Sequence, residues 1–145
     1  MRKAEYYIAV YGILENEKGE ILMMERKNTG FMDGKYGLPA GHLEWYETLK
    51  EGVVREIQEE ISIIVKEKDL ELIHTSHRIT HWDRVYLDFY FRIHKYSGEI
   101  SNGEPEKCSN IRFLDKQNSD IVPYLKDIFQ YIQKWKTFSE IHINS

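Results

Sequence analysis

Residues 41–63 read GHLEWYETLKEGVVREIQEEISI, and this stretch has the pattern of an amphipathic helix that begins after a loop. Apolar residues recur at helical spacing from Thr48 to Ile61, which predicts a single apolar stripe. The stripe consists of Leu49, Val53, Ile57 and Ile61, with Val54 alongside. At about 100° per residue, Glu56, Glu59 and Glu60 fall within roughly one third of the helix circumference. The helix therefore carries three carboxylates on one face.

Three carboxylates on one helix face indicate a site for a hard cation. Like charges at helical spacing repel by roughly a few tenths of a kcal/mol per exposed pair, and these three border the apolar stripe, where solvent screening is weaker. Carboxylate oxygens suit Mg²⁺ or Mn²⁺, and no Cys or His lies beside them to favour zinc. An isolated EIQEE segment is more often a solvated acidic face. The surrounding residues therefore decide between the two interpretations.

The residues around the carboxylates resemble the Nudix box. From Gly41 the chain follows the pattern Gly, five residues, Glu, seven residues, Arg-Glu-apolar-x-Glu-Glu-x-Gly-apolar, with Ser62 in place of the last Gly. So many fixed residues at fixed gaps make an accidental match improbable. The chain is thus identified as a member of the Nudix hydrolase family, similar to MutT-like members. Glycine readily supplies a left-handed helix cap, so Ser62 bears on helix termination, at a cost of about 1 kcal/mol, and not on catalysis.

The resemblance implies roles for residues inside and just before the box. Glu56, Glu59 and Glu60 correspond to the family's ligands for divalent metal ions and to its catalytic core. The backbone carbonyl of Ala40, which precedes the box glycine Gly41, is expected to join the metal shell. Two further residues, Glu47 and Arg55, match the family's structural ion pair, which holds the box loop and the carboxylate face in register.

The general base has two candidates. Some family members use the first core glutamate, here Glu56, and others use a glutamate on a later loop. Glu106 is the best loop candidate, both as base and as an additional metal ligand, and Glu104 is a close competitor. Plain loop acidity is the alternative interpretation for both loop residues.

Substrate contacts are expected from the second strand onward. Arg26 closes that strand, where the family often has a basic residue near phosphate, and Lys35 is a second candidate. Phe31 and Tyr36 could stack on a base, although surface aromatics more often pack under a loop. Asp120 is a weaker candidate for base recognition.

The remaining chemistry-bearing residues favour structural roles. His74, His77 and His81 lie close together in sequence, and His is a frequent metal ligand. On a strand, however, His74 and His77 face opposite ways, which favours an accidental cluster over a zinc site. His42 lies inside the box loop and could approach a substrate phosphate. Cys108 has no clear activating partner and is expected to be structural.

Composition sets the broad class. The chain has 145 residues, which suits a single domain over 1–145, and a formal net charge of −4. Nucleic acid polymers are held by clustered Lys and Arg, so this charge argues against such a partner. One cysteine permits no intrachain disulfide and the N-terminus lacks the apolar run of a signal peptide, so a cytoplasmic location is expected. No stretch approaches the roughly 20 apolar residues of a membrane span.

Outside the box, strands alternate with helices. Strands are predicted at 5–14, 21–24, 70–79, 84–96 and 111–114, and a second amphipathic helix over 125–132. The segment 16–19 predicts a hairpin turn between the first two strands, and residues 81–83 predict another turn. From about Ser139 the chain is expected to fray. This order indicates an α/β fold, and the family resemblance implies an α/β/α sandwich with a central mixed sheet and flanking helices.

The functional expectation is a Mg²⁺-dependent hydrolase, with Mn²⁺ as a substitute, that releases pyrophosphate from a nucleoside triphosphate. An oxidised or otherwise noncanonical base is one option. The alternatives are hydrolysis of nucleoside diphosphate sugars or dinucleoside polyphosphates, and a noncatalytic nucleotide-sensing module, which all three core glutamates disfavour. The expected partners are small nucleotides or nucleoside diphosphate derivatives, without a nucleic acid polymer or a membrane. A homodimer is left open.

Overall fold

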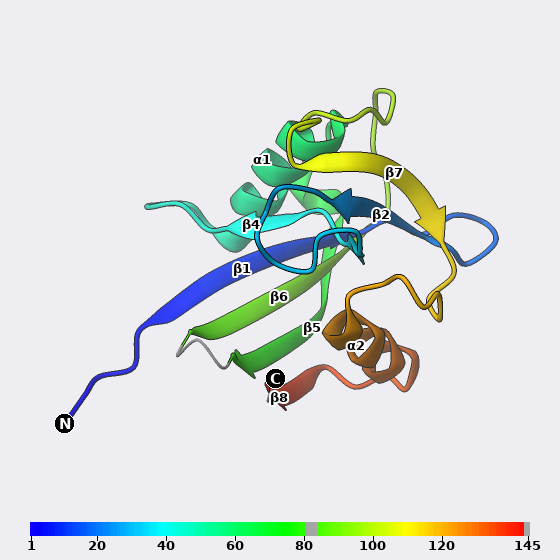
Figure 1. The fold of residues 1–145 in the computed structure, drawn as a ribbon. Coiled ribbons are helices and arrows are strands. Elements are labelled where there is room, and N and C mark those ends of the chain that lie inside the picture. The colour runs from blue at the N-terminus through cyan, green and yellow to red at the C-terminus, as the bar shows by residue number, and fades with distance from the viewer. Residues whose placement is uncertain (81–83, 144–145) are drawn as a thin grey trace.

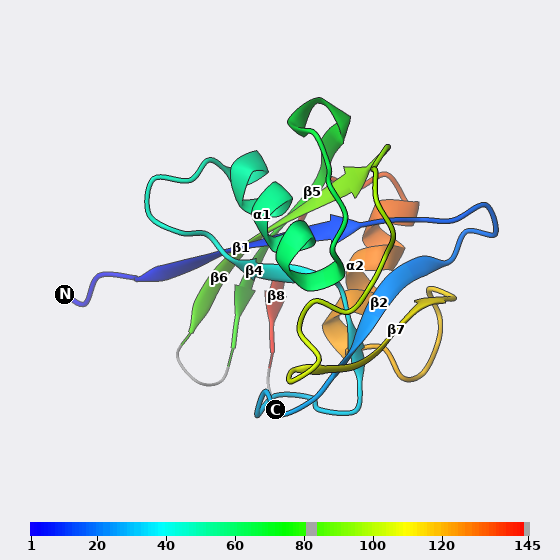
Figure 2. The ribbon, with the colours of Figure 1, turned by 90° about the horizontal axis from the view of Figure 1, so that it is seen from above.

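The computed structural model describes residues 1–80 and 84–143, in which two helices lie on opposite sides of the β-structure (Figures 1 and 2). The predicted turn at 81–83 lies outside the described residues. In chain order the elements are β1 Tyr6–Ile13, β2 Ile21–Arg26, β3 Tyr36–Gly37, β4 Ala40–His42, α1 Leu49–Ile61, the short 3-10 helix Glu67–Asp69, β5 Leu70–Ile79, β6 Val85–Ile93, β7 Cys108–Leu114, α2 Pro123–Gln133 and β8 Phe138–His142.

The strands form two sheets between the helices. The larger sheet has the order β4-β1-β6-β5-β8, and the smaller one has the order β3-β2-β7. In the larger sheet β1 is parallel to β6 and antiparallel to β4, whereas β5 is antiparallel to β6 and parallel to β8. The predicted mixed sheet with flanking helices is therefore confirmed.

Alternation along the central strands divides the core between the two helices. In β1, Ala9 and Tyr11 pack on the α2 side, while Val10 packs on the α1 side, as a period of two requires. From the helices, α2 contributes Leu125, Ile128 and Phe129, and α1 contributes Val53, Ile57 and Ile61. The predicted stripe of α1 is thus the buried face of that helix. Its carboxylates are left at the border between core and solvent.

Local signals set both ends of α1. Thr48 caps the N-terminus in a capping box, because its side chain accepts from the Glu51 N–H while the Glu51 carboxylate accepts from the Thr48 N–H. At the C-terminus Ser62 has φ 66°, which is left-handed, and its N–H donates to the Gln58 carbonyl. The departure from glycine therefore lies where the sequence predicted a left-handed cap.

Three expectations outside the box need correction. The turn after β1 forms, but β1 and β2 enter different sheets and meet only at the Glu15–Ile21 bridge, so they are not a regular hairpin. Strand β7 begins at Cys108, three residues before the prediction, because it pairs with β2 as far as Arg26. The chain after Ser139 does not fray up to residue 143. It forms β8, in which Ser139 is buried. The Ser139 hydroxyl shares a hydrogen bond of 2.8 Å with Nε2 of the buried His74 imidazole.

Candidate active site

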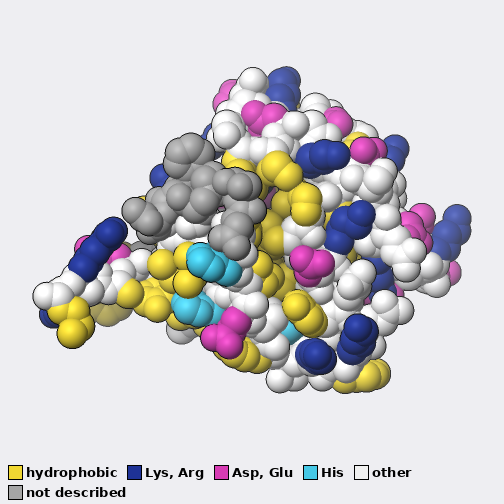
Figure 3. Space-filling view, turned by 60° about the horizontal axis from the view of Figure 1, so that its bottom comes forward, with side chains coloured by type: hydrophobic (Ala, Val, Ile, Leu, Met, Phe, Trp, Pro, Cys, Tyr) yellow, Lys and Arg dark blue, Asp and Glu magenta, His cyan; other side chains and the backbone are white. Residues whose placement is uncertain are grey.

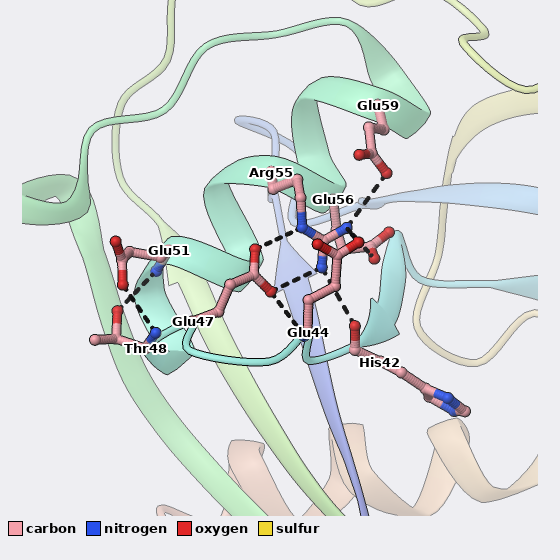
Figure 4. Close-up of polar contacts among 8 residues, drawn as sticks. All are labelled: His42, Glu44, Glu47, Thr48, Glu51, Arg55, Glu56 and Glu59. Carbon is pink, nitrogen blue, oxygen red and sulfur yellow. Dashed lines mark hydrogen bonds and ion pairs between the residues drawn. The ribbon is translucent and has the colours of Figure 1, made fainter.

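Arg55 ties the box loop to α1 (Figure 4). Its Nε and Nη2 donate to the two carboxylate oxygens of Glu47 at 2.5 and 2.9 Å, and Nη2 also donates to the His42 carbonyl at 3.2 Å. The hydrogen bond from Arg55 lowers the pKa of Glu47, so this pair is charged at neutral pH. A bidentate pair fixes direction as well as distance. The structural role expected for Glu47 and Arg55 matches this geometry.

The remaining nitrogen of Arg55 holds two of the core carboxylates. Its Nη1 donates to Glu56 Oε1 at 2.7 Å and to Glu59 Oε2 at 3.4 Å. The Glu59 side chain is half-exposed, whereas only 13% of the Glu56 side chain is exposed. One guanidinium thus bridges the loop, a buried carboxylate and a carboxylate at the surface.

Glu60 is the most buried of the three core carboxylates. It is 8% exposed, and its Oε1 accepts from the Ala40 N–H at 3.0 Å. Burial, followed by the negative charge of Glu56, raises the pKa of Glu60 well above its ordinary value. Burial also raises the pKa of Glu56, despite the opposing effect of Arg55. Two adjacent carboxyls with raised pKa values bind a proton more readily than ordinary glutamates, and a divalent cation competes for the same oxygens.

Gly41 provides the space for this carboxylate pair. A Cβ at position 41 would overlap the Glu56 carboxylate. Strand β4 therefore approaches α1 closely enough for the Ala40 N–H to reach Glu60. Ala40 and Gly41, which the box resemblance singled out, are brought against the core glutamates by backbone proximity.

The loop before β7 docks on the C-terminal end of α1. The Gly103 N–H donates to the Glu60 carbonyl at 2.9 Å, and a Cβ at position 103 would overlap the Glu59 carbonyl. The next residue, Glu104, is half-buried, and its negative charge contributes to the raised pKa of Glu60, behind burial and Glu56. Glu106 is exposed, and its carbonyl accepts from the Asn28 side chain at 3.2 Å. Of the two loop candidates, Glu104 is thus the one beside the carboxylate cluster.

The carboxylates have the right donors for a metal ion but do not converge on one point. Among the described residues, no three Asp, Glu, His or Cys side chains form a ready-made metal site. The physical reason is that Arg55 holds Glu56 and Glu59, while Glu60 turns toward the Ala40 N–H. Buried hard oxygen donors with raised pKa values nevertheless fit a divalent cation, because neutralising their charge relieves the cost of burial.

A cleft of about 700 Å³ begins at Ala40, Gly41 and His42 and runs along the α2 side of the larger sheet. Arg26 and Phe31 line it, as the substrate predictions require, and the Arg26 Nε donates to the Phe31 carbonyl at 2.7 Å. On the face that Figure 3 shows, hydrophobic side chains gather in the middle, with Lys and Arg side chains along one side. The cleft has the volume of a small-molecule site, and its Ala40 and Gly41 end contacts Glu60 and Glu56.

Three predicted substrate contacts lie elsewhere. Tyr36 is 5% exposed and packs in the core, where its hydroxyl accepts from the Asn110 side chain, so stacking on a substrate base is excluded. Among the described residues that line the cleft, neither Lys35 nor Asp120 is present. Both are chain neighbours of Tyr36 and Ile121, which are buried and joined by a bridge, and backbone alternation favours the opposite direction for their side chains.

The structure shows the surroundings of His74 and His77 and the burial of Cys108. The His74 ring is buried and bonded to the Lys136 carbonyl and the Ser139 hydroxyl, which is a structural role. The His77 ring lies 5.6 Å from the Tyr6 ring, and His81 lies outside the described residues. Cys108 is buried.

His42 has two functions at the edge of the cleft. Its carbonyl accepts from Arg55, whereas its imidazole points away from the carboxylates and lines the cleft (Figure 4). Burial, followed by the charge of Arg84, lowers the pKa of His42, so the imidazole is neutral at pH 7. It therefore offers a ring face and not a positive charge.

The sequence reasoning missed an ion pair at the floor of the cleft. Arg78 donates to both oxygens of Asp88, at 2.7 and 3.2 Å, although Arg78 is 6% exposed and Asp88 is fully buried. The signal was available, because Asp88 interrupts the apolar β6 and Arg78 stands on β5. Both residues lie on the face of the larger sheet that packs against α2, where the ring of Tyr124 contacts Arg78.

Comparisons with known proteins agree with this site. A family model described as the NUDIX domain matches residues 5–132. The chain belongs to the Nudix family. Among solved structures, the fold is similar to a MutT Nudix hydrolase from Burkholderia pseudomallei, with TM-score 0.78 and 21% identity over 87% of this chain and 97% of that one. A MutT protein from Methanosarcina mazei Go1 gives TM-score 0.75 and 23% identity, over 92% and 97% of the two chains.

Two curated relatives carry functional names. The Nudix chain is 33% identical to an ADP-ribose pyrophosphatase of Methanocaldococcus jannaschii over 89% of its own length and 74% of that protein. It is 32% identical to an 8-oxo-dGTP diphosphatase of Escherichia coli K12, over 77% and 84% of the two chains. The predictions of a MutT-like Nudix hydrolase acting on phosphoric anhydride bonds are therefore confirmed at family level, and Nudix hydrolases as a family use divalent metal ions. Neither described helix is long and apolar enough to cross a membrane.

Proposed function

We propose that this Nudix chain hydrolyses a nucleoside triphosphate to the monophosphate and pyrophosphate, and that its substrates include oxidised or otherwise noncanonical nucleotides. One observation carries the proposal: the cleft of about 700 Å³ is lined at one end by Ala40 and Gly41, which contact the buried carboxylates of Glu60 and Glu56. A nucleoside in that cleft would place its phosphates at the carboxylate face. The small triphosphate chain needs no second pocket for its leaving group.

Mg²⁺, with Mn²⁺ as a substitute, would be held by Glu56, Glu59 and Glu60 together with the Ala40 carbonyl. When bound, the metal neutralises phosphate charge and increases the acidity of water. The Ala40 carbonyl lies on the same residue whose N–H already bonds Glu60. To bind the metal, Glu56 and Glu59 must leave the Nη1 of Arg55, while Glu47 keeps the other two nitrogens in place.

Each protein group then has a defined task. Arg55 and Glu47 position α1 against the box loop. Glu56 is placed to accept a proton from the attacking water, because burial raises its pKa above that of an ordinary glutamate. Glu59 is half-exposed and can turn toward the phosphates. Arg26, on the cleft wall, contributes positive charge toward the substrate, and Phe31 offers a ring face to the base.

The loop ligand in this proposal is Glu104 and not Glu106. Gly103 fixes the loop backbone on the end of α1, and the charge of Glu104 acts on Glu60. Glu106 remains the alternative, and it would have to move with the exposed segment that Asn28 now holds. The two candidates are separated by single substitutions to glutamine.

A substrate panel tests the proposal. The purified chain is assayed with Mg²⁺ on canonical triphosphates, 8-oxo-dGTP, ADP-ribose and a dinucleoside polyphosphate. We expect a triphosphate to have the highest kcat/KM and to yield monophosphate and pyrophosphate in equal amounts. Water labelled with ¹⁸O identifies the phosphorus that is attacked. Stepwise release of orthophosphate, or no cleavage of any triphosphate, would contradict the proposal.

A second candidate is hydrolysis of a nucleoside diphosphate derivative such as ADP-ribose. The 33% identity to an ADP-ribose pyrophosphatase over 89% of the chain favours it specifically. The carboxylate chemistry is the same, and only the group beyond the second phosphate differs. A far higher kcat/KM for ADP-ribose than for every triphosphate would replace the first candidate by the second. A noncatalytic sensing module is disfavoured because all three core glutamates are present.

A further inference from the structure

The Arg78–Asp88 pair lies under two tyrosines that line the cleft. The guanidinium of Arg78 stacks on the ring of Tyr86 at 4.1 Å and on the ring of Tyr124 at 4.4 Å. Arg78, Tyr86 and Tyr124 all line the cleft, as does Tyr11. A buried, bidentate ion pair between two aromatic rings is rigid, so the tyrosine rings are held at defined positions.

The hydrogen bonds around this pair have only one consistent proton arrangement. Asp88 accepts from Arg78 as a carboxylate, so it can only accept from Tyr11, whose hydroxyl lies 3.1 Å away. The single proton of Tyr11 is thereby committed to Asp88. The Tyr11 oxygen also accepts from Arg78 Nη2 at 3.3 Å. The Tyr124 hydroxyl, 3.0 Å from the Tyr11 hydroxyl, must therefore donate its own proton to Tyr11.

In this arrangement the Tyr124 hydroxyl has no proton left for a ligand, so it can only accept a hydrogen bond from one. A tyrosine hydroxyl normally donates or accepts, as its ligand requires. Here the donor capacity of Tyr124 is used by Tyr11. Tyr124 and Arg26 both line the cleft, so the Tyr124 side chain and a basic side chain share its wall. The chain Asp88–Tyr11–Tyr124 thus sets the hydrogen-bonding character of one wall of the cleft.

We infer that the Tyr124 hydroxyl is a fixed hydrogen-bond acceptor that selects nucleobases presenting an N–H group at the inner end of the cleft. The inference rests on the proposed function in one respect, that the cleft holds the base. A base with an amino group or a protonated ring nitrogen at that point is accepted. A base with a lone pair there meets a second lone pair and leaves the Tyr124 oxygen unpaired. The residue is a specificity determinant and takes no part in bond cleavage.

Binding of nucleoside monophosphates tests the inference without hydrolysis. The dissociation constants of three pairs are measured by calorimetry: GMP and IMP, AMP and purine riboside 5′-monophosphate, and 8-oxo-dGMP and dGMP. The first member of each pair carries an N–H group that the second lacks. In at least one pair we expect the wild type to bind the first member about tenfold more tightly. In the Tyr124→Phe variant the same pair should differ by less than about threefold.

Two further variants separate selection from packing. Tyr131→Phe removes a hydroxyl from the same helix outside the cleft, and it should leave the affinity ratio unchanged. Tyr11→Phe keeps the Tyr124 hydroxyl but removes the oxygen that accepts its proton, so Tyr124 can donate again and the affinity ratio should fall. The inference is overturned if none of the monophosphates binds, if all three pairs bind equally to the wild type, or if the ratio survives either Tyr124→Phe or Tyr11→Phe. Failure of the proposed function would appear separately, as absence of triphosphate cleavage.

Discussion

The carboxylate of Glu56 occupies the space in which a side chain at Gly41 would begin. This contact joins the start of the box to its helix across fourteen intervening residues. It explains why the pattern begins with glycine although the residue has no chemistry of its own. Strand β4 and α1 can approach only if one of the two positions lacks a side chain, and Glu56 is needed for its carboxylate.

Replacement of Gly41 by alanine should therefore damage the active site. The added Cβ must displace Glu56 or separate β4 from α1, and a displacement of about 1 Å costs roughly 100-fold in rate. We expect turnover to fall by about that factor. Gly37→Ala is the matched control, because the nearest atom to its Cβ is an Arg26 side-chain carbon at 4.0 Å. Equal losses in both variants would show that the Gly41–Glu56 contact is unimportant.

Replacement of Ser62 by glycine should stabilise the fold. Ser62 adopts φ 66°, which a residue with a Cβ occupies at a cost of about 1 kcal/mol. Glycine removes this strain, but it also has more conformational entropy in the unfolded chain, which offsets part of the gain. A net stabilisation of about 0.5 kcal/mol is therefore expected. Urea denaturation measures it, and turnover should not change. Ser62→Ala keeps the strain and serves as control. A stability of Ser62→Gly at or below that of Ser62→Ala would contradict the prediction.

Arg55→Ala should lower both stability and turnover. The substitution leaves the half-buried Glu47 and Glu56 without their partner, and a loss of about 2 kcal/mol is expected. Arg55→Lys keeps the charge without the bidentate geometry and should recover only part of the turnover. Thermal denaturation and steady-state kinetics are compared for the three proteins. Full recovery by lysine would indicate that charge alone, and not the fork, positions the loop.

The two loop glutamates should differ in activity and not in stability. Glu104→Gln is expected to lower kcat strongly, because the charge of Glu104 acts on the carboxylate cluster. Glu106→Gln should have a small effect, because Glu106 is exposed and contributes its backbone carbonyl to the Asn28 contact. Both variants should melt within a few degrees of the wild type. A larger loss of kcat in Glu106→Gln would restore Glu106 as the loop ligand.

The raised pKa of Glu60 predicts how metal-free stability depends on pH. The folded state holds the Glu60 proton more tightly than the unfolded chain, whose glutamate pKa is near 4.5. The wild type therefore loses stability as the pH rises from that value through the raised folded pKa. Glu60→Gln has no proton to lose. When metal is removed by EDTA, the melting temperature of Glu60→Gln minus that of the wild type should therefore increase with rising pH. Glu59→Gln is the control.

The opposite effect is expected when Mg²⁺ is present. Metal binding displaces the proton, so the Mg²⁺-induced rise in melting temperature should grow from pH 5.5 to pH 8.5 in the wild type and be reduced in Glu60→Gln. A Mg²⁺ shift that is independent of pH, together with parallel pH profiles of the metal-free proteins, would show that Glu60 carries no displaceable proton.

The sequence predicted the helix, its left-handed C-terminal cap and its carboxylate face because these features are local. Period, cap and charge spacing in residues 41–63 involve neighbours within one or two turns. The observed bounds of β5 agree with the strand predicted at 70–79. The left-handed conformation at Ser62 could be predicted because the Nudix box pattern has glycine at this position. In each case the information needed was contained in a short window.

The features that escaped prediction depend on pairing between distant segments. The sequence does not show that β1 and β2 enter different sheets, or that residues after 137 pair with β5. It also does not show that Asp88 is fully buried, where Tyr11 and Arg78 donate hydrogen bonds to it. The loop candidates Glu104 and Glu106 stand two residues apart, and the docking of Gly103 on α1 separates them. Contacts between distant segments thus determine the shape and lining of the cleft, whereas local sequence spacing determines that the carboxylates share one helix face.

Turnover of a nucleoside triphosphate by Glu59→Gln at saturating Mg²⁺ tests the central claim most directly. Glu59 is the half-exposed core carboxylate, so its amide isostere should leave the melting temperature unchanged. If the carboxylate face holds the metal for hydrolysis, kcat should fall by at least about 100-fold, while Glu67→Gln, an exposed glutamate outside the box, should retain wild-type kcat. Near-wild-type turnover by Glu59→Gln under these conditions would contradict the assignment of the carboxylate face as the catalytic metal site.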